Sequence, residues 1–178
     1  MESYFGEKKM NVIGDIASKE NIKRIIEISK KTEFIIRLDS LEAAIKINKM
    51  AETENVIINY NIIVDSGLHR FGVSLKNLLT FAEELKKLKY LKLKGISSHP
   101  GHVYSSTCEA DIQQYVLDEC ETLRKAKEIL EKEGYYLEYI ISGSTPTFEE
   151  AVKDLNINVY HPGNYVFLDS AVDRKSVV

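Results

Sequence analysis

The sequence has no excess of basic charge. Its 24 lysines and arginines stand against 27 aspartates and glutamates, which gives a formal net charge of −3. Nucleic-acid-binding proteins usually carry a concentrated positive field, because they neutralise phosphates. The charge balance therefore argues against nucleic-acid binding. With 178 residues, of which 44% are apolar and 29% charged, the chain has the size and composition of one globular domain with a substantial core.

Long apolar runs and a secretory leader are also missing from the sequence. No stretch approaches the ~20 consecutive apolar residues that a membrane-spanning helix needs. Residues 1–6 lack the basic-then-apolar pattern of a signal peptide. We therefore expect no membrane association and a cytoplasmic location.

Cysteine is scarce, and the two cysteines present cannot pair with each other. Cys108 and Cys120 are predicted to lie on one helix, where a separation of twelve residues corresponds to ~18 Å. This distance is too long for a disulfide. Reduced thiols agree with a cytoplasmic location, and we expect no metal site at these cysteines.

Short apolar runs recur along the chain. Several of them, such as residues 34–36 and 62–64, are continuous rather than alternating. Strands buried on both faces have this pattern, and parallel sheets covered by helices produce it. The runs predict six strands: Asn11–Ile16, Glu33–Leu38, Val56–Asp65, Leu91–Ser98, Leu137–Ile141 and Ile157–Tyr160.

Amphipathic stretches lie between these runs. Residues 22–26, 75–85 and 109–133 place apolar side chains at the i, i+3, i+4 spacing of a buried helix face. A last short helix is predicted to bury Phe148, Ala151, Val152 and Leu155. Two pairs have the spacing of a capping box at a helix start: Ser106 with Glu109, and Thr147 with Glu150.

About six βα units follow from this alternation. Repeated βα units build either a (βα)8 barrel or an open doubly wound sheet. No G-x-G-x-x-G follows the first strand, which argues against the dinucleotide-binding version of the open sheet. A complete barrel usually needs about 250 residues. The sequence therefore predicts a partial (βα)8 barrel that lacks two units.

Two loops near the end of the chain suggest a phosphate site. Residues 142–147 read SGSTPT directly after an apolar run, and residues 161–164 read HPGN. Small residues, free backbone N–H groups and hydroxyls at strand ends form a phosphate cradle. A phosphorylated cofactor or substrate is therefore the first hypothesis.

Two earlier loops add polar side chains to the same predicted rim. Arg70 follows the strand that ends at Asp65, where it can bind an anion or merely pair with a carboxylate. His99 and His102 have H-x-x-H spacing, but the Pro-Gly between them breaks any helix, and nothing nearby completes a zinc site. Tyr104 can contact a phosphate or a ring, or can serve packing alone.

The four loops, taken in order, resemble those of one enzyme family. VDSGLHRFGV at residues 64–73 resembles the barrel motif of the alanine-racemase-like, fold type III pyridoxal-phosphate enzymes. SHPGHVY, SGSTPT and HPGNYVFLD are similar to the branch of D-threonine aldolases and D-serine dehydratases (deaminases). The resemblance extends from about Asn11 to Asp169.

This resemblance implies a barrel that holds pyridoxal phosphate, followed by a C-terminal β-domain, in a homodimer. Arg70 would lie beside the cofactor ring, and Tyr104 would also contact the cofactor. The substrate would be a D-amino acid, which the enzyme cleaves, dehydrates or racemises. The residues that the resemblance assigns to the cofactor phosphate are Gly143, Ser144, Thr145, Gly163 and Asn164.

The sequence departs from the family in what it lacks. The family's cofactor-binding lysine sits on the first barrel strand, in a basic, histidine-containing stretch that does not occur here. Lys8 and Lys9 precede the first predicted strand as ordinary surface lysines, so no catalytic residue is assigned. The family's divalent metal is held by the C-terminal domain, so no metal ligand is assigned either.

We expect the chain to be a fragment, with residues 1–172 forming the partial cofactor-binding barrel. The resemblance stops near residue 172, and residues 173–178 are expected to be a non-native tail. Such a fragment is expected to be inactive by itself. The alternatives are an amino-acid racemase, a non-catalytic pyridoxal-phosphate carrier of the same fold, or a different phosphate-binding barrel enzyme.

Overall fold

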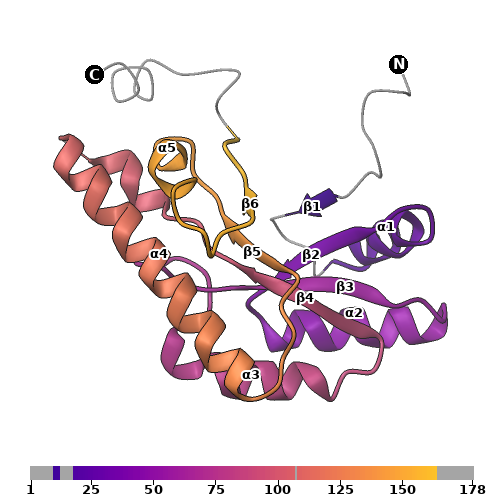
Figure 1. The fold of residues 1–178 in the computed structure, drawn as a ribbon. Coiled ribbons are helices and arrows are strands. Elements are labelled where there is room, and N and C mark those ends of the chain that lie inside the picture. Colours follow the sequence, from indigo (N-terminus) through magenta and orange to yellow (C-terminus); the bar gives the residue numbers. More distant parts are fainter. Residues whose placement is uncertain (1–9, 13–17, 107, 164–178) are drawn as a thin grey trace.

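The computed structural model of the chain describes residues 10–12, 18–106 and 108–163. In this part of the chain, strands and helices alternate (Figure 1). The strands are β1 (Met10–Val12), β2 (Phe34–Leu38), β3 (Ile58–Ile63), β4 (Leu91–Ser97), β5 (Tyr139–Ser142) and β6 (Val159–Tyr160). The helices are α1 (Lys19–Ser29), α2 (Leu41–Thr53), α3 (Leu75–Lys86), the 3-10 helix η1 (Gly101–Ser105), α4 (Glu109–Lys132) and α5 (Phe148–Ala151).

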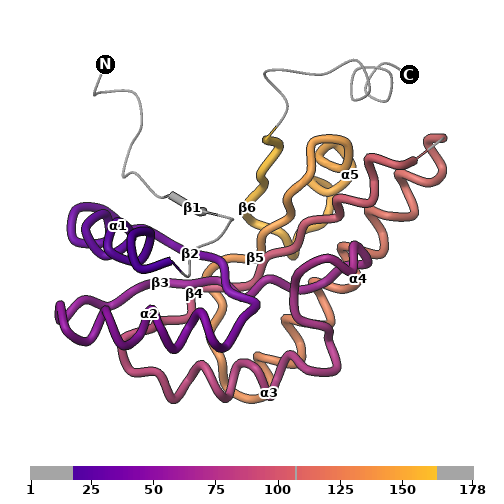
Figure 2. Tube along the Cα trace, turned by 180° about the vertical axis from the view of Figure 1, so that it is seen from behind, coloured from indigo at the N-terminus to yellow at the C-terminus, as the bar shows by residue number. Residues whose placement is uncertain are grey.

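The six strands form one parallel sheet in the order β1-β2-β3-β4-β5-β6. The sheet curls, and helices α1 to α4 cover its outer face (Figures 1 and 2). An open doubly wound sheet reverses its strand order at a switch point, whereas a barrel adds each new strand beside the last. The sequential order therefore confirms the partial (βα)8 barrel. The described strands also lie where the apolar runs predict them, and the ends of β2 to β6 differ by at most a few residues. Residues 13–16 of the first predicted strand lie outside the described residues.

The two faces of the sheet differ in polarity. Alternate side chains of the strands, such as Ile36, Ile62 and Ile96, pack with the helices in one apolar core. Because successive side chains point to opposite faces of a strand, Arg37 and Asn61 lie on the inner face. These two are register partners, and both are almost completely buried. The inner face therefore carries polar side chains among apolar ones such as Ile35, Ile63 and Ile141.

Helix α2 is an element that no amphipathic stretch indicated. Its buried positions are largely alanine: Ala43, Ala44 and Ala51, with Ile47 as the one large side chain. Alanine gives a weak hydrophobic period, although it favours helix. The Ser40 hydroxyl accepts a hydrogen bond from the Ala43 N–H at 3.3 Å and caps the first turn.

The last helix and both capping boxes differ from the prediction. Helix α5 has only four residues, and of its expected buried set only Ala151 is inside, while Leu155 is almost fully exposed. Ser106 does not cap α4, because its hydroxyl donates to the Val103 carbonyl at 2.6 Å and Cys108 takes the cap position. Thr147 holds the predicted cap position of α5, but its hydroxyl donates backwards to the Ser144 carbonyl at 3.3 Å.

Both cysteines are free, as the sequence predicts. Cys108 is exposed at the start of α4. Cys120 is partly buried in the same helix, and burial, with a smaller contribution from Asp154, raises the pKa of its thiol to about 12. Among the described helices, none is long and apolar enough to span a membrane.

Candidate functional site

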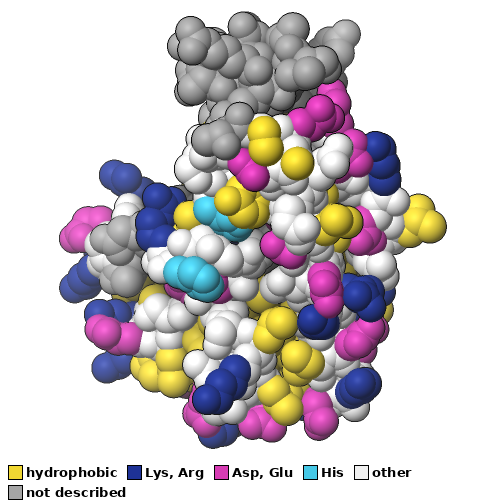
Figure 3. Space-filling view, turned by 90° about the vertical axis from the view of Figure 1, so that its left-hand side faces the viewer, with side chains coloured by type: hydrophobic (Ala, Val, Ile, Leu, Met, Phe, Trp, Pro, Cys, Tyr) yellow, Lys and Arg dark blue, Asp and Glu magenta, His cyan; other side chains and the backbone are white. Residues whose placement is uncertain are grey.

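The carboxyl ends of β3 to β6 bring the four predicted loops together. Gly67 lies against the imidazole of His102, and Gly143 lies against the carbonyl oxygen of Ser98. Figure 3 shows histidine side chains exposed between basic and apolar side chains on one face of the molecule. In parallel βα folds, ligands bind at this edge of the sheet.

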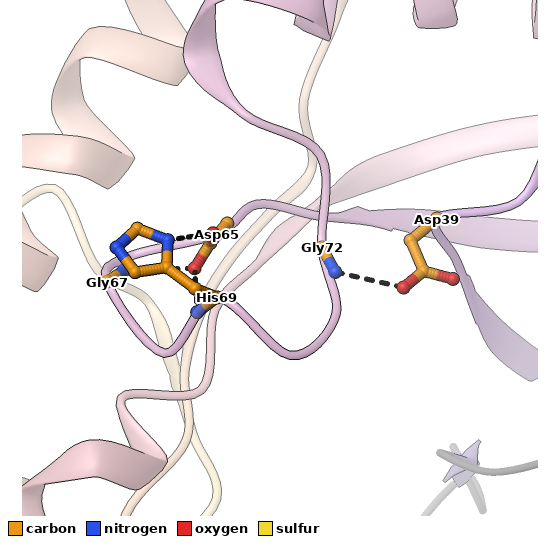
Figure 4. Close-up of polar contacts among 5 residues, drawn as sticks. All are labelled: Asp39, Asp65, Gly67, His69 and Gly72. Carbon is orange, nitrogen blue, oxygen red and sulfur yellow. Dashed lines mark hydrogen bonds and ion pairs between the residues drawn. The ribbon is translucent and has the colours of Figure 1, made fainter.

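The loop after β3 is held by two aspartates (Figure 4). Asp65 accepts hydrogen bonds from the N–H groups of Gly67 (3.0 Å) and His69 (3.1 Å), and pairs with the His69 imidazole at 2.8 Å. Desolvation acts to raise the pKa of Asp65, but these hydrogen bonds outweigh it and lower that pKa. Asp39, after β2, accepts from the Gly72 N–H at 2.9 Å. The loop is therefore rigidly shaped.

Gly72 allows this loop to close. Its φ of +97° is strained for any side chain, and a Cβ there would lie 2.8 Å from the Asp65 nitrogen. The turn lets Val73 pair with the chain leaving β3, through Asp65 N to Val73 O at 3.0 Å. Arg70 is consequently presented at the tip of the loop.

Arg70 is exposed and lies over an aromatic ring. Its guanidinium carbon is 5.2 Å from the centre of the Phe71 ring, and Phe71 stacks on His99 with centroids 6.0 Å apart. Among the described residues, no carboxylate forms an ion pair with Arg70. The alternative in which Arg70 pairs with a carboxylate at the rim therefore has no partner in the described part of the chain.

The two histidines of the next loop have different partners. His99 Nδ1 hydrogen-bonds to the Gly143 carbonyl, and since that oxygen can only accept, Nδ1 must carry the proton. Burial, reinforced by Arg37 and Arg70, lowers the pKa of His99. His102 instead meets the Tyr115 ring edge-on, with centroids 4.4 Å apart. In the described ranges, no three metal-ligating side chains are grouped to hold a metal ion.

A buried glutamate that the sequence analysis did not identify forms hydrogen bonds with the loops that follow β4 and β5. Glu119, on α4, is fully buried and accepts hydrogen bonds from the hydroxyls of Ser98 and Ser142 (3.0 Å for Ser142) and from the Gly143 N–H. Burial raises the pKa of Glu119 to about 6, although these hydrogen bonds oppose the rise. Glu119 therefore ties α4 to the ends of β4 and β5.

The predicted phosphate residues occupy the loops after β5 and β6. Ser144 is buried, and its hydroxyl has no hydrogen-bond partner among the described residues. Thr145 is half-buried, and its carbonyl accepts the Phe148 N–H at 3.3 Å. Gly163 is exposed, and its N–H donates to His161 O at 2.9 Å. Asn164 lies outside the described residues, and Tyr104, 37% exposed, lies on η1 nearby in sequence.

Arg37 is a second site residue that the sequence analysis missed. It extends from β2, is 5% exposed, and donates from Nη2 to His161 Nδ1. Its Nε has no acceptor among the described residues. Burial lowers the pKa of Arg37 to about 10, and burial together with Arg37 lowers the pKa of His161 to about 4. The signal in the sequence was one charged residue inside the apolar run 34–38.

Lysines on the described strands lie at the opposite edge of the sheet. They are Lys92 and Lys94, both in the amino-terminal half of β4. Lys94 forms ion pairs with Glu138 at 2.6 Å and Glu33 at 3.3 Å. Within the described strands, no lysine reaches the edge that carries the loops.

The chain is a segment of a parallel barrel with buried hydrogen-bond donors at its carboxyl edge. In barrels of this class, ligands bind at that edge. The chain belongs to the family described as alanine racemase, N-terminal domain, whose profile matches residues 3–171. This assignment agrees with the resemblance of the four loops.

Individual relatives support the family. The D-serine dehydratase of Dictyostelium discoideum is 31% identical over 117 residues, which cover 60% of this chain and 29% of the relative. Two solved structures share the fold. D-threo-3-hydroxyaspartate dehydratase from Delftia sp. has a TM-score of 0.81 at 22% identity and matches 90% of this chain and 43% of its own. D-threonine aldolase from Filomicrobium marinum has a TM-score of 0.67 at 15% identity, with 92% and 43% covered. The chain spans less than half the length of these relatives.

Proposed function

We propose that this chain is the pyridoxal-phosphate-binding barrel segment of an enzyme that acts on D-amino acids, of the dehydratase or aldolase type. The observation that carries the proposal is a set of buried donors that have no partner among the described residues. Ser144 Oγ is buried at the carboxyl edge and Arg37 Nε on the inner face of the sheet, and the strand-end loops resemble those of the family. Buried polar groups normally have partners, so unpaired donors favour a ligand that accepts hydrogen bonds.

The residues present fit the phosphate group of the cofactor. Ser144 offers a hydroxyl that has no partner among the described residues, and Thr145 and Gly163 lie on loops that follow adjacent parallel strands. Phosphate oxygens are acceptors only, so they complement hydroxyl and N–H donors. The Gly143 N–H already donates to Glu119, so we assign Gly143 a role through its close approach to neighbouring backbone. Asn164 keeps its predicted role.

The remaining side chains would orient the ring and hold protons. Arg70 would lie beside the ring, and Tyr104 would contact the cofactor from η1. His99, neutral near pH 7 because its pKa is lowered, presents Nε2 as a proton acceptor while Nδ1 donates to Gly143 O. Bound pyridoxal phosphate supplies an electron sink for breaking a bond next to the amino group of a substrate.

A comparison of pyridoxal phosphate with pyridoxal tests this proposal, because the two differ only in the phosphate. We expect the chain to bind pyridoxal phosphate at least about tenfold more tightly by calorimetry, which corresponds to about 1.4 kcal/mol. Ser144→Ala should reduce this preference, whereas Ser105→Ala, which removes an exposed hydroxyl on η1, should not. Equal affinities for the two compounds would contradict the proposal.

We also propose that the 178-residue chain alone has no turnover. The motive is that the described strands place no lysine at the carboxyl edge, where covalent attachment of the cofactor would occur. Purified chain incubated with pyridoxal phosphate and D-serine or D-threonine should form no pyruvate, glycine or acetaldehyde. Detectable product would refute this part of the proposal.

Racemisation is the second candidate activity for the whole protein. The alanine racemase of Halothermothrix orenii is 24% identical over 123 residues, so one sequence relative favours it. A whole protein that converts D-serine to L-serine without forming pyruvate would favour the racemase. The resemblance also leads us to propose a divalent metal and a homodimer for the whole protein, which metal analysis and sedimentation would test.

A further inference from the structure

We propose that Arg37, together with the hydroxyl of Ser97, forms an oxyanion-binding site on the inner face of the sheet. Neither residue belongs to the loops that resemble the family's phosphate motif. The ligand chemistry is a phosphate or a carboxylate group. The site itself stands on the geometry alone, whereas its connection to a cofactor phosphate or a substrate carboxylate rests on the proposed function.

The position of the Arg37 guanidinium places the site within the curl of the sheet. Arg37 is on β2, and His161 follows β6. These two strands are four positions apart, which is about 19 Å across a flat sheet. The contact between Arg37 Nη2 and His161 Nδ1 therefore requires the side chain to reach across the concave face. The guanidinium lies inside the curl and not at the outer rim.

The Arg37 guanidinium has more hydrogen-bond donors than it has acceptors among the described residues. It carries five N–H donors, and the contact with His161 uses one of them. Its Nε is buried without a partner among the described residues. His161 is neutral near pH 7, because its pKa is lowered to about 4, and it brings no negative charge. A buried cation without a counter-ion is costly, and a bound oxyanion would remove that cost.

Ser97 adds a second unsatisfied donor on the same face. It is fully buried, and its hydroxyl has no partner among the described residues. Ser97 pairs in register with Ile63 on one side and Ile141 on the other, so its immediate strand neighbours offer it apolar side chains. A guanidinium and a hydroxyl are the donors that phosphate and carboxylate oxygens accept from.

The carboxylates at the rim are engaged elsewhere. Asp39 accepts from the Gly72 N–H, and Asp65 accepts from Gly67 and pairs with His69. Among the described residues, no carboxylate forms an ion pair with Arg37. An external oxyanion thus has no described internal competitor at the guanidinium.

Binding of inorganic phosphate tests the site without any cofactor. Calorimetry or phosphorus NMR on the 178-residue chain should give saturable binding that Arg37→Met weakens at least about tenfold. Ser97→Ala should weaken binding by a smaller factor. The matched control is Arg124→Met, which removes an exposed arginine 4.0 Å from Glu128 on α4 and should leave binding unchanged.

Unfolding midpoints show whether a variant that binds no phosphate is still folded. Arg37→Met replaces a buried cation by an apolar chain of similar length, so its unfolding midpoint without phosphate should equal or exceed that of the wild type. Phosphate should raise the midpoint of the wild type and of Arg37→Lys, but not of Arg37→Met. Equal stabilisation of wild type and Arg37→Met by phosphate would overturn the site, as would a wild type that binds no phosphate.

Pyridoxal phosphate, pyridoxal and acetate identify the source of the oxyanion. If Arg37→Met loses the preference for pyridoxal phosphate over pyridoxal, the site takes the cofactor phosphate. If this variant keeps that preference but loses acetate binding, the site takes a carboxylate. A wild type that binds phosphate through Arg37 but does not distinguish the two pyridoxal compounds would refute the proposed function and leave the oxyanion site standing. A wild type that prefers pyridoxal phosphate to pyridoxal but does not bind inorganic phosphate through Arg37 would refute the oxyanion site and leave the proposed function standing.

Discussion

The two edges of the sheet treat their polar groups in opposite ways. At the amino edge, Lys94 joins Glu33, before β2, to Glu138, before β5. Asn158 accepts from the Ile140 N–H at 2.8 Å and donates to the Glu138 carbonyl at 2.9 Å. At the carboxyl edge and inner face, donors such as Arg37 Nε are buried without partners among the described residues.

This difference separates the structural edge from the functional edge. Polar groups that serve only the fold can satisfy one another, as Lys94, Glu138 and Asn158 do at the amino edge. Buried donors without an acceptor lower the stability of the chain unless a bound ligand accepts their hydrogen bonds. In the part of the chain that the structure describes, most buried side-chain atoms without a hydrogen-bond partner lie on the inner face or in the strand-end loops: Arg37 Nε, Ser66 Oγ, Ser97 Oγ, His102 Nδ1 and Ser144 Oγ.

Glu119 is an exception at the functional edge, because its carboxylate is buried and already accepts several hydrogen bonds. We expect Glu119→Ala to cost about 3 kcal/mol in the free energy of unfolding, since it leaves two buried hydroxyls and a backbone N–H unpaired. Denaturant unfolding monitored by circular dichroism measures this. Glu128→Ala, at an exposed position of the same helix, should change stability by no more than about 0.5 kcal/mol. A loss below about 1 kcal/mol for Glu119→Ala would contradict the supporting role.

One glycine at each edge allows the cost of adding a Cβ to be compared between the two edges. Gly72 (φ +97°) is at the functional edge and Gly134 (φ +78°) precedes β5. A Cβ at Gly72 meets the Asp65 nitrogen, whereas a Cβ at Gly134 meets nothing within 4 Å. Gly72→Ala should therefore cost about 2 kcal/mol or more and Gly134→Ala about 1 kcal/mol, both measured by denaturant unfolding. Equal losses would mean that the close contact relaxes.

Lys94→Met tests the saturated edge. Removing this cation leaves Glu33 and Glu138 without their shared partner, and we expect a loss of about 1–2 kcal/mol that shrinks in high salt. Lys46→Met is the matched control, because its pair with Glu42 at 2.7 Å is exposed to solvent and should contribute little to stability. A Lys94→Met variant as stable as the control would show that the amino edge does not depend on this cluster.

The dependence of stability on pH should carry opposite signs from Glu119 and His161. The folded-state pKa of His161, about 4, lies below its ordinary value, so its contribution is present above pH 6.5 and is lost as pH falls toward 4. The raised pKa of Glu119, about 6, makes its contribution fall as pH rises from 4.5 through 6. Unfolding free energies at several pH values should show that His161→Asn lowers the acid sensitivity of the chain. An unchanged acid slope would contradict the half-buried, neutral state of His161.

The sequence predicted the parts of the fold that depend on local pattern. Continuous apolar runs located β2 and β3, and small residues after strands located the loops at 142–147 and 161–164. Helix α2 was missed because alanine produces little amphipathic contrast, and α5 was predicted too long because its apolar residues continue past a turn that leaves Leu155 exposed.

The missed site residues share a signal whose meaning is not local. Arg37 interrupts an apolar run, and Glu119 falls on the buried stripe of α4 with Val116 and Leu123. Each is a charge where the pattern calls for an apolar side chain, which marks it as unusual. Their partners, His161 for Arg37 and Ser98 with Ser142 for Glu119, are 21 to 124 residues away along the chain. Only the curl of the sheet brings these pairs together.

The two cysteines give the molecule a built-in attachment point for a spectroscopic reporter. Thiolate is the reactive form of cysteine, so the raised pKa and partial burial of Cys120 make it slow to alkylate at neutral pH. Cys108 is exposed at the start of α4, soon after η1. A maleimide fluorophore should therefore label the unmodified chain at one position near the loops, where its emission can report ligand binding without an engineered residue.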